Sequence, residues 1–188
     1  ALAISYALDN NIVLTLPELK DIIVSSVNNL NPYLTGFKTN VAGGTLNLAS
    51  YNNKMGTGLI DAYRVLMAVR GTKCIPIPVG EEVIISVSSY IGDGTNDKIK
   101  MLESEIPEEA IEALGIENIK WMGGKLMLTC TKPGSALVTL KYVAGGTNVG
   151  GGQITGGMET QQEFAFVARY GVSYDEGTLE PITPGGWL

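Results

Sequence analysis

The stretch Lys54-Met-Gly-Thr-Gly-Leu-Ile-Asp-Ala-Tyr-Arg64, which continues as Val-Leu-Met-Ala-Val-Arg70, separates two parts of the chain that differ in character. Before it the pattern is helical with a polar loop, whereas after Gly71 it becomes β-rich and acidic. Apolar residues behind its two glycines recur at the spacing of one helix face: Leu59, Ala62, Tyr63, Leu66 and Val69. We therefore expect a closing helix over Gly56–Arg70 and two domains, residues 1–71 and 72–188.

Two further helices are expected in the first domain. Residues 1–9 are apolar almost all round, which is typical of the end of a buried helix. Thr15-Leu-Pro-Glu18 has the pattern of a capping box and predicts a second helix that runs to about Leu30. One face of it would carry Leu19, Ile22, Ile23, Val27 and Leu30. Residues 31–53 read as a long loop, with strand near Thr45–Leu48.

After Gly71 the apolar period changes to two, which predicts strands. The segments are Val83–Ser88, Lys125–Lys132, Ala136–Val143 and Glu163–Tyr170. The turn residues Pro133-Gly-Ser135 predict a hairpin between the second and third of these strands. Pro107–Leu114, acidic at its start and followed by a glycine, predicts a short inserted helix. The predicted class is α+β: a helical N-terminal segment followed by an antiparallel, immunoglobulin-like β-sandwich.

Charge and hydropathy exclude several kinds of partner. The 188-residue chain has a net charge of −6. Residues 1–71 carry five Lys/Arg and four Asp/Glu, whereas residues 72–188 carry eight and fifteen. Such an acidic C-terminal part is unsuited to nucleic acid or anionic lipid. Because no run of about 18 apolar residues occurs, no membrane span is expected.

The absence of histidine limits the chemistry further. A Ser-His-Asp or Cys-His site needs imidazole as its base, and this chain has none. A zinc site would have only carboxylates, Cys74 and Cys130, with no CxxC pair. We therefore assign no catalytic, cofactor-binding or metal-ligating residue, and expect neither a cofactor nor an enzyme in this chain alone. Free thiols are favoured over a disulfide, because Cys130 lies in an alternating strand beside Leu126 and Leu128.

Several motifs allow a functional and a structural interpretation, and we favour the structural one for each. The glycines of 145–157 lack the context of a phosphate loop and suit a hairpin tip or a bulge. Gly56-Thr-Gly58 could hold an anion at a helix start, but close packing explains it better. Asp93-Gly-Thr-Asn-Asp97 could ligate calcium or form a turn.

The glutamates within 103–112 could form a glycosidase acid–base pair, but a solvated helix explains them better. Five aromatic residues could form a sugar- or peptide-binding platform, but packing in the core explains them better. These residues are Trp121, Trp187, Tyr142, Tyr170 and Tyr174.

In order and residue type, the first domain resembles the end of the catalytic domain of subtilisin-like serine peptidases. Ala1–Leu8 is similar to the far end of the helix that carries their nucleophilic Ser. Pro17-Glu-Leu-Lys-Asp-Ile-Ile23 resembles the next helix, and Gly56-Thr-Gly-Leu-Ile-Asp-Ala62 the closing one. The family's Gly-Thr-Ser motif would stand before Ala1, and its Asp, His and oxyanion Asn further upstream. No catalytic residue of the family is therefore present.

Residues 72–188 resemble the C-terminal β-domain of some secreted bacterial members of this family. The residues that carry the resemblance are Gly134–Leu140, Gly151–Met158, Glu163–Arg169 and the terminal Gly-Gly-Trp-Leu. The resemblance implies a bacterial protein that is secreted, periplasmic or on the cell surface. It also implies two partners, the remainder of the catalytic domain and a protein or peptide substrate.

The hypothesis is a non-catalytic C-terminal fragment of a secreted subtilisin-like serine endopeptidase, which supplies scaffold and an accessory β-domain. One alternative is a stand-alone secreted β-sandwich that binds protein or glycan, and another is a purely structural domain. The first helix is too uniformly apolar to be covered by two neighbours. We therefore expect helices 1–9 and 59–70 to expose apolar surface, which favours self-association.

The purified chain should not hydrolyse a casein-type substrate, because it has neither a histidine base nor a nucleophile motif. Release of soluble peptides measures this, with an active serine peptidase as the positive control. Turnover that a serine-directed inhibitor blocks would contradict the expectation.

Overall fold

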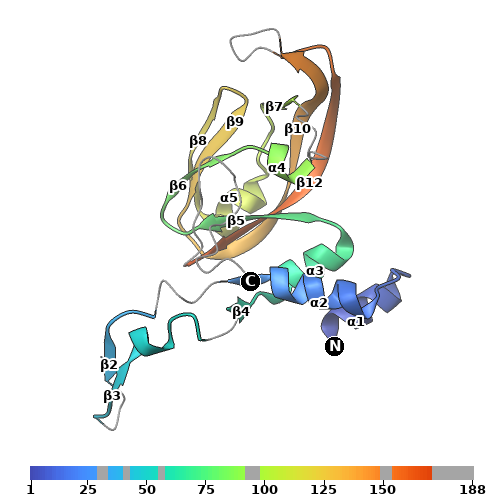
Figure 1. Cartoon of the computed structure of the whole chain (residues 1–188). Coiled ribbons are helices and arrows are strands. Elements are labelled where there is room, and N and C mark those ends of the chain that lie inside the picture. The colour runs from blue at the N-terminus through green and yellow to red at the C-terminus, as the bar shows by residue number, and fades with distance from the viewer. Residues whose placement is uncertain (29–33, 40–42, 55–57, 92–97, 149–153, 171–188) are drawn as a thin grey trace. The chain divides into compact units, whose positions relative to one another are not determined.

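The structure is a computed structural model that describes residues 1–28, 34–39, 43–54, 58–91, 98–148 and 154–170. The chain is of mixed α+β class, as predicted. It divides into two compact units, with the boundary between Gly71 and Thr72. We call them the helical unit and the β unit (Figure 1).

The helical unit contains α1 (Leu2–Asp9), α2 (Leu16–Ser25) and α3 (Ala62–Arg70). Its small core is formed by Ala3 and Ala7 of α1 and by Val65 and Val69 of α3. Side chains that pack against this core are half-buried: Tyr6, Ile12, Leu14, Leu19 and Ile22. No residue of α2 is fully buried, so this helix is only half covered.

The predicted capping box of α2 is confirmed. The amide of Thr15 donates to Glu18 Oε2 over 2.8 Å, and the amide of Glu18 donates to Thr15 Oγ1 over 3.4 Å. Hydrogen bonds from the Thr15 hydroxyl and amide lower the pKa of Glu18. The helix ends at Ser25 rather than near Leu30, because Ser26 leaves helical geometry and β1 (Val27–Asn28) follows at once.

The closing helix is shorter than predicted, so its expected start at Gly56 is wrong. Leu59–Ile60 forms β4, which pairs antiparallel with β1, and α3 begins only at Ala62. Asp61 is the N-cap, since its Oδ1 accepts from the amides of Tyr63 and Arg64. An aspartate followed by apolar residues is a typical N-cap pattern, so the sequence did contain the information that the helix begins after Asp61.

A small hairpin completes the described part of the helical unit. It consists of β2 (Phe37–Thr39) and β3 (Thr45–Asn47), followed by the 3₁₀ helix η2 (Leu48–Tyr51). The strand expected near Thr45–Leu48 is therefore confirmed.

Within the described residues, the larger sheet of the β unit has five strands. Their order is β11 (Ile154–Thr155), β10 (Gly134–Asn148), β12 (Met158–Arg169) and β5 (Lys73–Pro78), and β7 (Lys98–Leu102) also pairs with β10. All pairs are antiparallel except β5–β12, which is parallel. The prediction of an entirely antiparallel sheet is therefore wrong for β5, a strand that the period-two pattern did not include.

The second sheet, as far as its residues are described, has three strands in the order β6 (Glu82–Ile85), β9 (Lys125–Cys130) and β8 (Ile116–Met122). The predicted hairpin between Lys125–Lys132 and Ala136–Val143 is wrong, because β9 and β10 lie in different sheets. The segment that connects β9 to β10 packs against the end of α5 (Glu108–Leu114). There the amide of Lys132 donates to the Leu114 carbonyl over 3.0 Å. The actual hairpin joins β8 and β9 through Gly123-Gly124.

Both sheets contribute side chains to one core. Fully buried residues include Ile75 and Ile77 of β5, and Phe164 and Phe166 of β12. The rings of Phe164 and of Tyr90 in α4 (Ser88–Ile91) form a T-shaped pair, with ring centroids 6.3 Å apart. The alternation expected in β9 is confirmed, since Leu126, Leu128 and Cys130 are all buried.

The predicted short helix is confirmed as α5, and Gly115 ends it in the left-handed region at φ +57°. A Cβ at Gly115 would collide with Thr131 Oγ1, which donates to the Gly115 carbonyl over 2.9 Å. Gly115 therefore serves both the backbone conformation and the close approach of the β9–β10 connection.

Gly115→Ala should lower the free energy of unfolding by about 2–3 kcal/mol, through left-handed strain and loss of the Thr131 hydrogen bond. Gly123→Ala is the matched control, since Gly123 has φ +62° and open space around its Cβ position. It should cost only about 1–2 kcal/mol. Urea unfolding measures both, and equal losses would contradict the role of Thr131.

Candidate functional site

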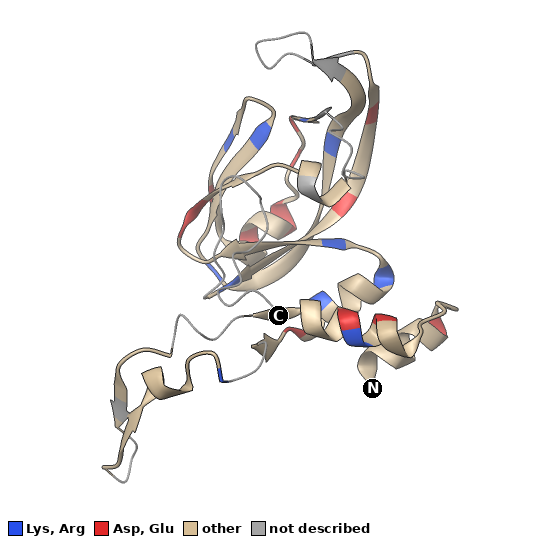
Figure 2. Ribbon diagram, viewed as in Figure 1, with Lys and Arg blue, Asp and Glu red and all other residues tan. Residues whose placement is uncertain are grey.

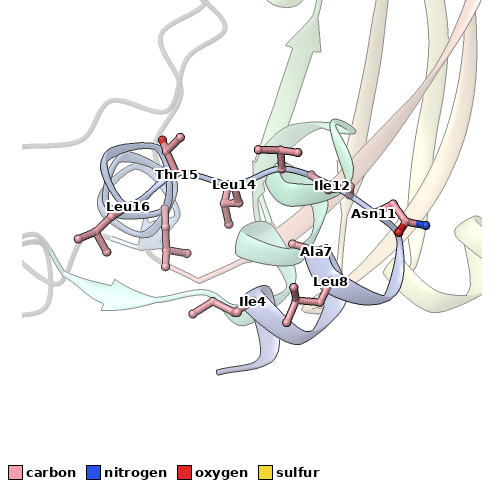
Figure 3. Close-up of a pocket in the computed structure, with 10 residues that line it drawn as sticks. Ile4, Ala7, Leu8, Asn11, Ile12, Leu14, Thr15 and Leu16 are labelled. Carbon is pink, nitrogen blue, oxygen red and sulfur yellow. The ribbon is translucent and has the colours of Figure 1, made fainter.

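One hollow of the helical unit lies between α1, α2 and the segment that joins them (Figure 3). Its volume is about 560 Å³. Apolar side chains dominate its lining, which comprises Ile4, Ala7, Leu8, Asn11, Ile12, Val13, Leu14, Thr15, Leu16 and Leu19. Leu8, Val13 and Leu16 are 72%, 89% and 80% exposed and together form an apolar patch at this hollow.

A second, smaller hollow of about 180 Å³ continues this surface toward α3. The two hollows share Ile4 and Leu19. The second also includes Ile23 of α2 and Ile60 of β4, which are 39% and 52% exposed. We call the lining of both hollows the apolar surface of the helical unit. Apolar surface exposed on α1 was predicted, and the exposure of Leu2, Ile4 and Leu8 confirms it.

The apolar surface has almost no charge. Asp9 is the single charged residue of α1, whose ribbon is mostly tan in Figure 2. No charged side chain lines the first hollow. Its polar residues are Asn11 and Thr15, and the Thr15 hydroxyl is already engaged with Glu18. Such a surface can bury apolar groups of a partner, but it offers no acid, base or nucleophile for catalysis.

A polar network holds α3 against the end of α2 and so fixes the apolar surface. Arg64 donates to the carbonyls of Val27 and Ser25 over 3.0 and 3.1 Å. The buried Asp61 accepts from Asn28 Nδ2 over 3.2 Å, and its amide donates to the Ser26 carbonyl over 2.8 Å. The Ser25 carbonyl, left open where α2 ends, thus accepts a hydrogen bond from a side chain of another helix.

The structure places the acidic candidates in solvent. All five glutamates of 103–112 are exposed, and Glu108 and Glu109 occupy the first turn of α5, where a negative charge is favourable. Within the part of the chain that the structure describes, no group of three or more His, Cys, Asp or Glu could hold a metal ion. Asp93–Asp97 lies outside the described residues.

The glycine motifs do not form ligand loops in the parts that are described. Gly58 precedes β4 and not a helix, so the expected helix start there is wrong, while Gly56 and Thr57 lie outside the described residues. The 145–157 region joins β10, β11 and β12, with a register shift after Val143. Its central residues, 149–153, are likewise not described.

The aromatic candidates occupy different environments. Tyr142 is in the core, where burial raises its pKa and its hydroxyl lies 3.3 Å from Gln162 Oε1. Trp121 is half-buried and packs against that core, whereas Tyr170 is 63% exposed. Trp187 and Tyr174 lie outside the described residues. The three described aromatic residues therefore do not form a shared platform, because Tyr142 is in the core, Trp121 is half-buried and Tyr170 is exposed.

Comparisons with known proteins add no assignment. No family model, no curated protein and no solved structure matches this chain. Among the described helices, none has both the length and the apolar character that crossing a membrane would require.

The two cysteines form no disulfide with each other; Cys74 is half-buried and Cys130 is buried. Burial raises the pKa of the Cys130 thiol from 9.0 to about 12. The folded state therefore keeps this thiol neutral at a pH where the unfolded chain ionises it. Its contribution to stability is present below pH 9 and is lost as pH rises toward 12.

In the variant Cys74→Ser, raising the pH from 8 to 10 should therefore lower the free energy of unfolding. The part due to Cys130 should be about 1 kcal/mol. Urea unfolding at both pH values measures it, with the double variant Cys74→Ser/Cys130→Ala as the control for all other groups. An identical pH dependence in the two variants would contradict the burial of an un-ionised Cys130.

Proposed function

We propose that this chain is the non-catalytic C-terminal part of a secreted bacterial subtilisin-like serine endopeptidase. The helical unit would be the last part of the catalytic domain. The β unit would be an accessory domain with an immunoglobulin-like sandwich. The observation that carries the proposal is the uncharged apolar surface of the helical unit, in the segment whose motifs resemble that family.

The energetics of α1 favour a missing neighbour on its outer side. Ala3 and Ala7 face the small core of the helical unit, while the larger Leu2, Ile4 and Leu8 are exposed. Burying one such aliphatic side chain is worth about 1.5–3 kcal/mol. An enclosing domain would therefore gain far more from the exposed side of α1 than the helical unit gains from the buried alanines.

The resemblance also says what the missing body would be. In the family, the helix that corresponds to α1 begins at the nucleophilic Ser and is long and apolar. That Ser would attack the peptide bond, with His as the base and Asp orienting the His. This chain would hold the far end of the Ser helix in place through α2 and α3, and would take no part in the proton transfers.

The β unit would add a separate function to the parent enzyme. It has a core of its own, and its part of the sequence is acidic. Substrate positioning and attachment to a surface are both compatible with these features.

The coding sequence upstream of Ala1 tests the proposal directly. A Gly-Thr-Ser motif followed by Pro-His is expected there, a short distance before α1. A signal peptide joined directly to Ala1 would overturn the proposal and favour the stand-alone binding module.

In the extended protein, Leu8→Gln and Leu16→Gln should each reduce stability by about 1.5–3 kcal/mol, because the catalytic body would bury both side chains. In the present chain the same variants should change it by less than about 0.5 kcal/mol, because both side chains are exposed.

Lys20→Gln is the matched control, since Lys20 is an exposed polar residue of α2. Thermal unfolding and the yield of secreted peptidase provide the measurements. If Leu16→Gln and Lys20→Gln behave alike in the extended protein, α2 is not covered by a catalytic body.

A further inference from the structure

A recess of about 240 Å³ lies in the β unit, where β7 meets the turn between β8 and β9. Trp121 and Met122 at the end of β8 line it. Lys100 of β7 and Glu103, which directly follows β7, also line it. The recess belongs to a single compact unit and is separate from the apolar surface of the helical unit.

Two glycines provide part of the lining of this recess. Gly123 and Gly124 have φ values of +62° and +75°, as a tight two-residue hairpin turn requires. The amide of Met101 donates to the Gly124 carbonyl over 3.3 Å and ties β7 to the turn. A Cβ at Gly124 would lie 2.8 Å from Lys100 Cγ, so the lysine stem runs close over a turn that has no side chains.

Trp121 gives the recess an aromatic wall with a polar group. Trp121 is half-buried, packs against the core and also lines the recess. Among the described residues, none forms a hydrogen bond with the indole N–H. The exposed Lys100 ammonium and Glu103 carboxylate likewise form no ion pair within the described part of the chain. The recess thus offers an apolar surface, a neutral donor, a cation and an acceptor.

This set of groups fits one sugar ring. A pyranose has an apolar C–H face that can stack on an indole, and hydroxyls that both donate to a carboxylate and accept from an ammonium. Lys100 and Glu103 cancel in charge, which favours a neutral ligand over an anion. The volume of 240 Å³ is below the roughly 300–1,000 Å³ of pockets for drug-sized ligands, and so suits a single ring.

An extended peptide fits the same place less well. Such a peptide would add to β8, which ends the order of its sheet. The pairing of β8 shifts register between Glu117 and Lys120, and Asn118 has φ +58°. A bulge of this kind interrupts the regular row of amides and carbonyls that an added strand needs.

We propose that the recess at Trp121 binds one pyranose residue of a glycan, with the ring stacked on the indole and its hydroxyls held by Lys100 and Glu103. The proposal does not rest on the peptidase function of the parent. If no sugar binds, the peptidase proposal still stands, and if the chain is no peptidase fragment, the recess can still bind a sugar.

A titration of the full ¹⁵N-labelled chain tests this proposal. The probes are the methyl glycosides of glucose, galactose, mannose and N-acetylglucosamine. The chain has two tryptophans, so Trp187→Phe assigns the indole N–H signal of Trp121. At least one glycoside should shift that signal saturably, with a dissociation constant of about 1–10 mM.

Glu103→Gln and Lys100→Met should each weaken this binding at least about fivefold, because each removes a charge-assisted hydrogen bond. Glu108→Gln, an exposed glutamate of α5 outside the recess, should leave it unchanged. Far-UV circular dichroism verifies that each variant is folded.

Three results would overturn the proposal. The first is no saturable shift with any glycoside up to about 50 mM. The second is equal binding by Glu103→Gln, Lys100→Met and the unaltered chain. The third is tighter saturation of the Trp121 signal by free glycine or by an unstructured peptide, which would identify a zwitterion or a peptide as the ligand.

Discussion

The parallel pairing of β5 with β12 is the constraint on which the β unit depends. It places residues 73–78 beside residues 164–169 and so joins the first described strand of the unit to the last. β5 stands at the end of its sheet, which accommodates Pro76 and Pro78, because an edge strand can dispense with the amide hydrogens that proline lacks. Ile75 and Ile77, on either side of Pro76, are completely buried and complete the core against Phe164 and Phe166.

Features decided by neighbouring residues could be predicted from the sequence. The Thr15–Glu18 capping box, the left-handed Gly115 after α5 and the alternation along β9 all depend on contacts within a few residues. Strand pairing depends on contacts far apart in the chain, and there the prediction was wrong. The turn at Pro133-Gly134 looked like a hairpin but connects two sheets, whereas the true hairpin had an equally strong Gly123-Gly124 signal.

The two candidate sites differ in how far the sequence could predict them. The apolar surface of the helical unit follows from one local property, because α1 is apolar around its whole circumference and only one side can face α3. The recess at Trp121 requires β7 to meet the β8–β9 turn, two segments some 20 residues apart with α5 between them. No pattern in either segment predicts this contact. The sequence could therefore identify Trp121 as a candidate binding residue, but it could not predict which residues lie beside it.

The β5–β12 pairing also has a consequence for synthesis on the ribosome. The two strands are about 90 residues apart, so β5 must wait on the order of 5–20 s for its partner at usual elongation rates. During that time Ile75 and Ile77 are an unpaired apolar strand, the kind of segment that seeds aggregation. Pro76 and Pro78 lack the amide hydrogens that a second nascent chain would need for pairing. The same prolines that an edge strand tolerates in the folded protein therefore protect it while the chain is incomplete.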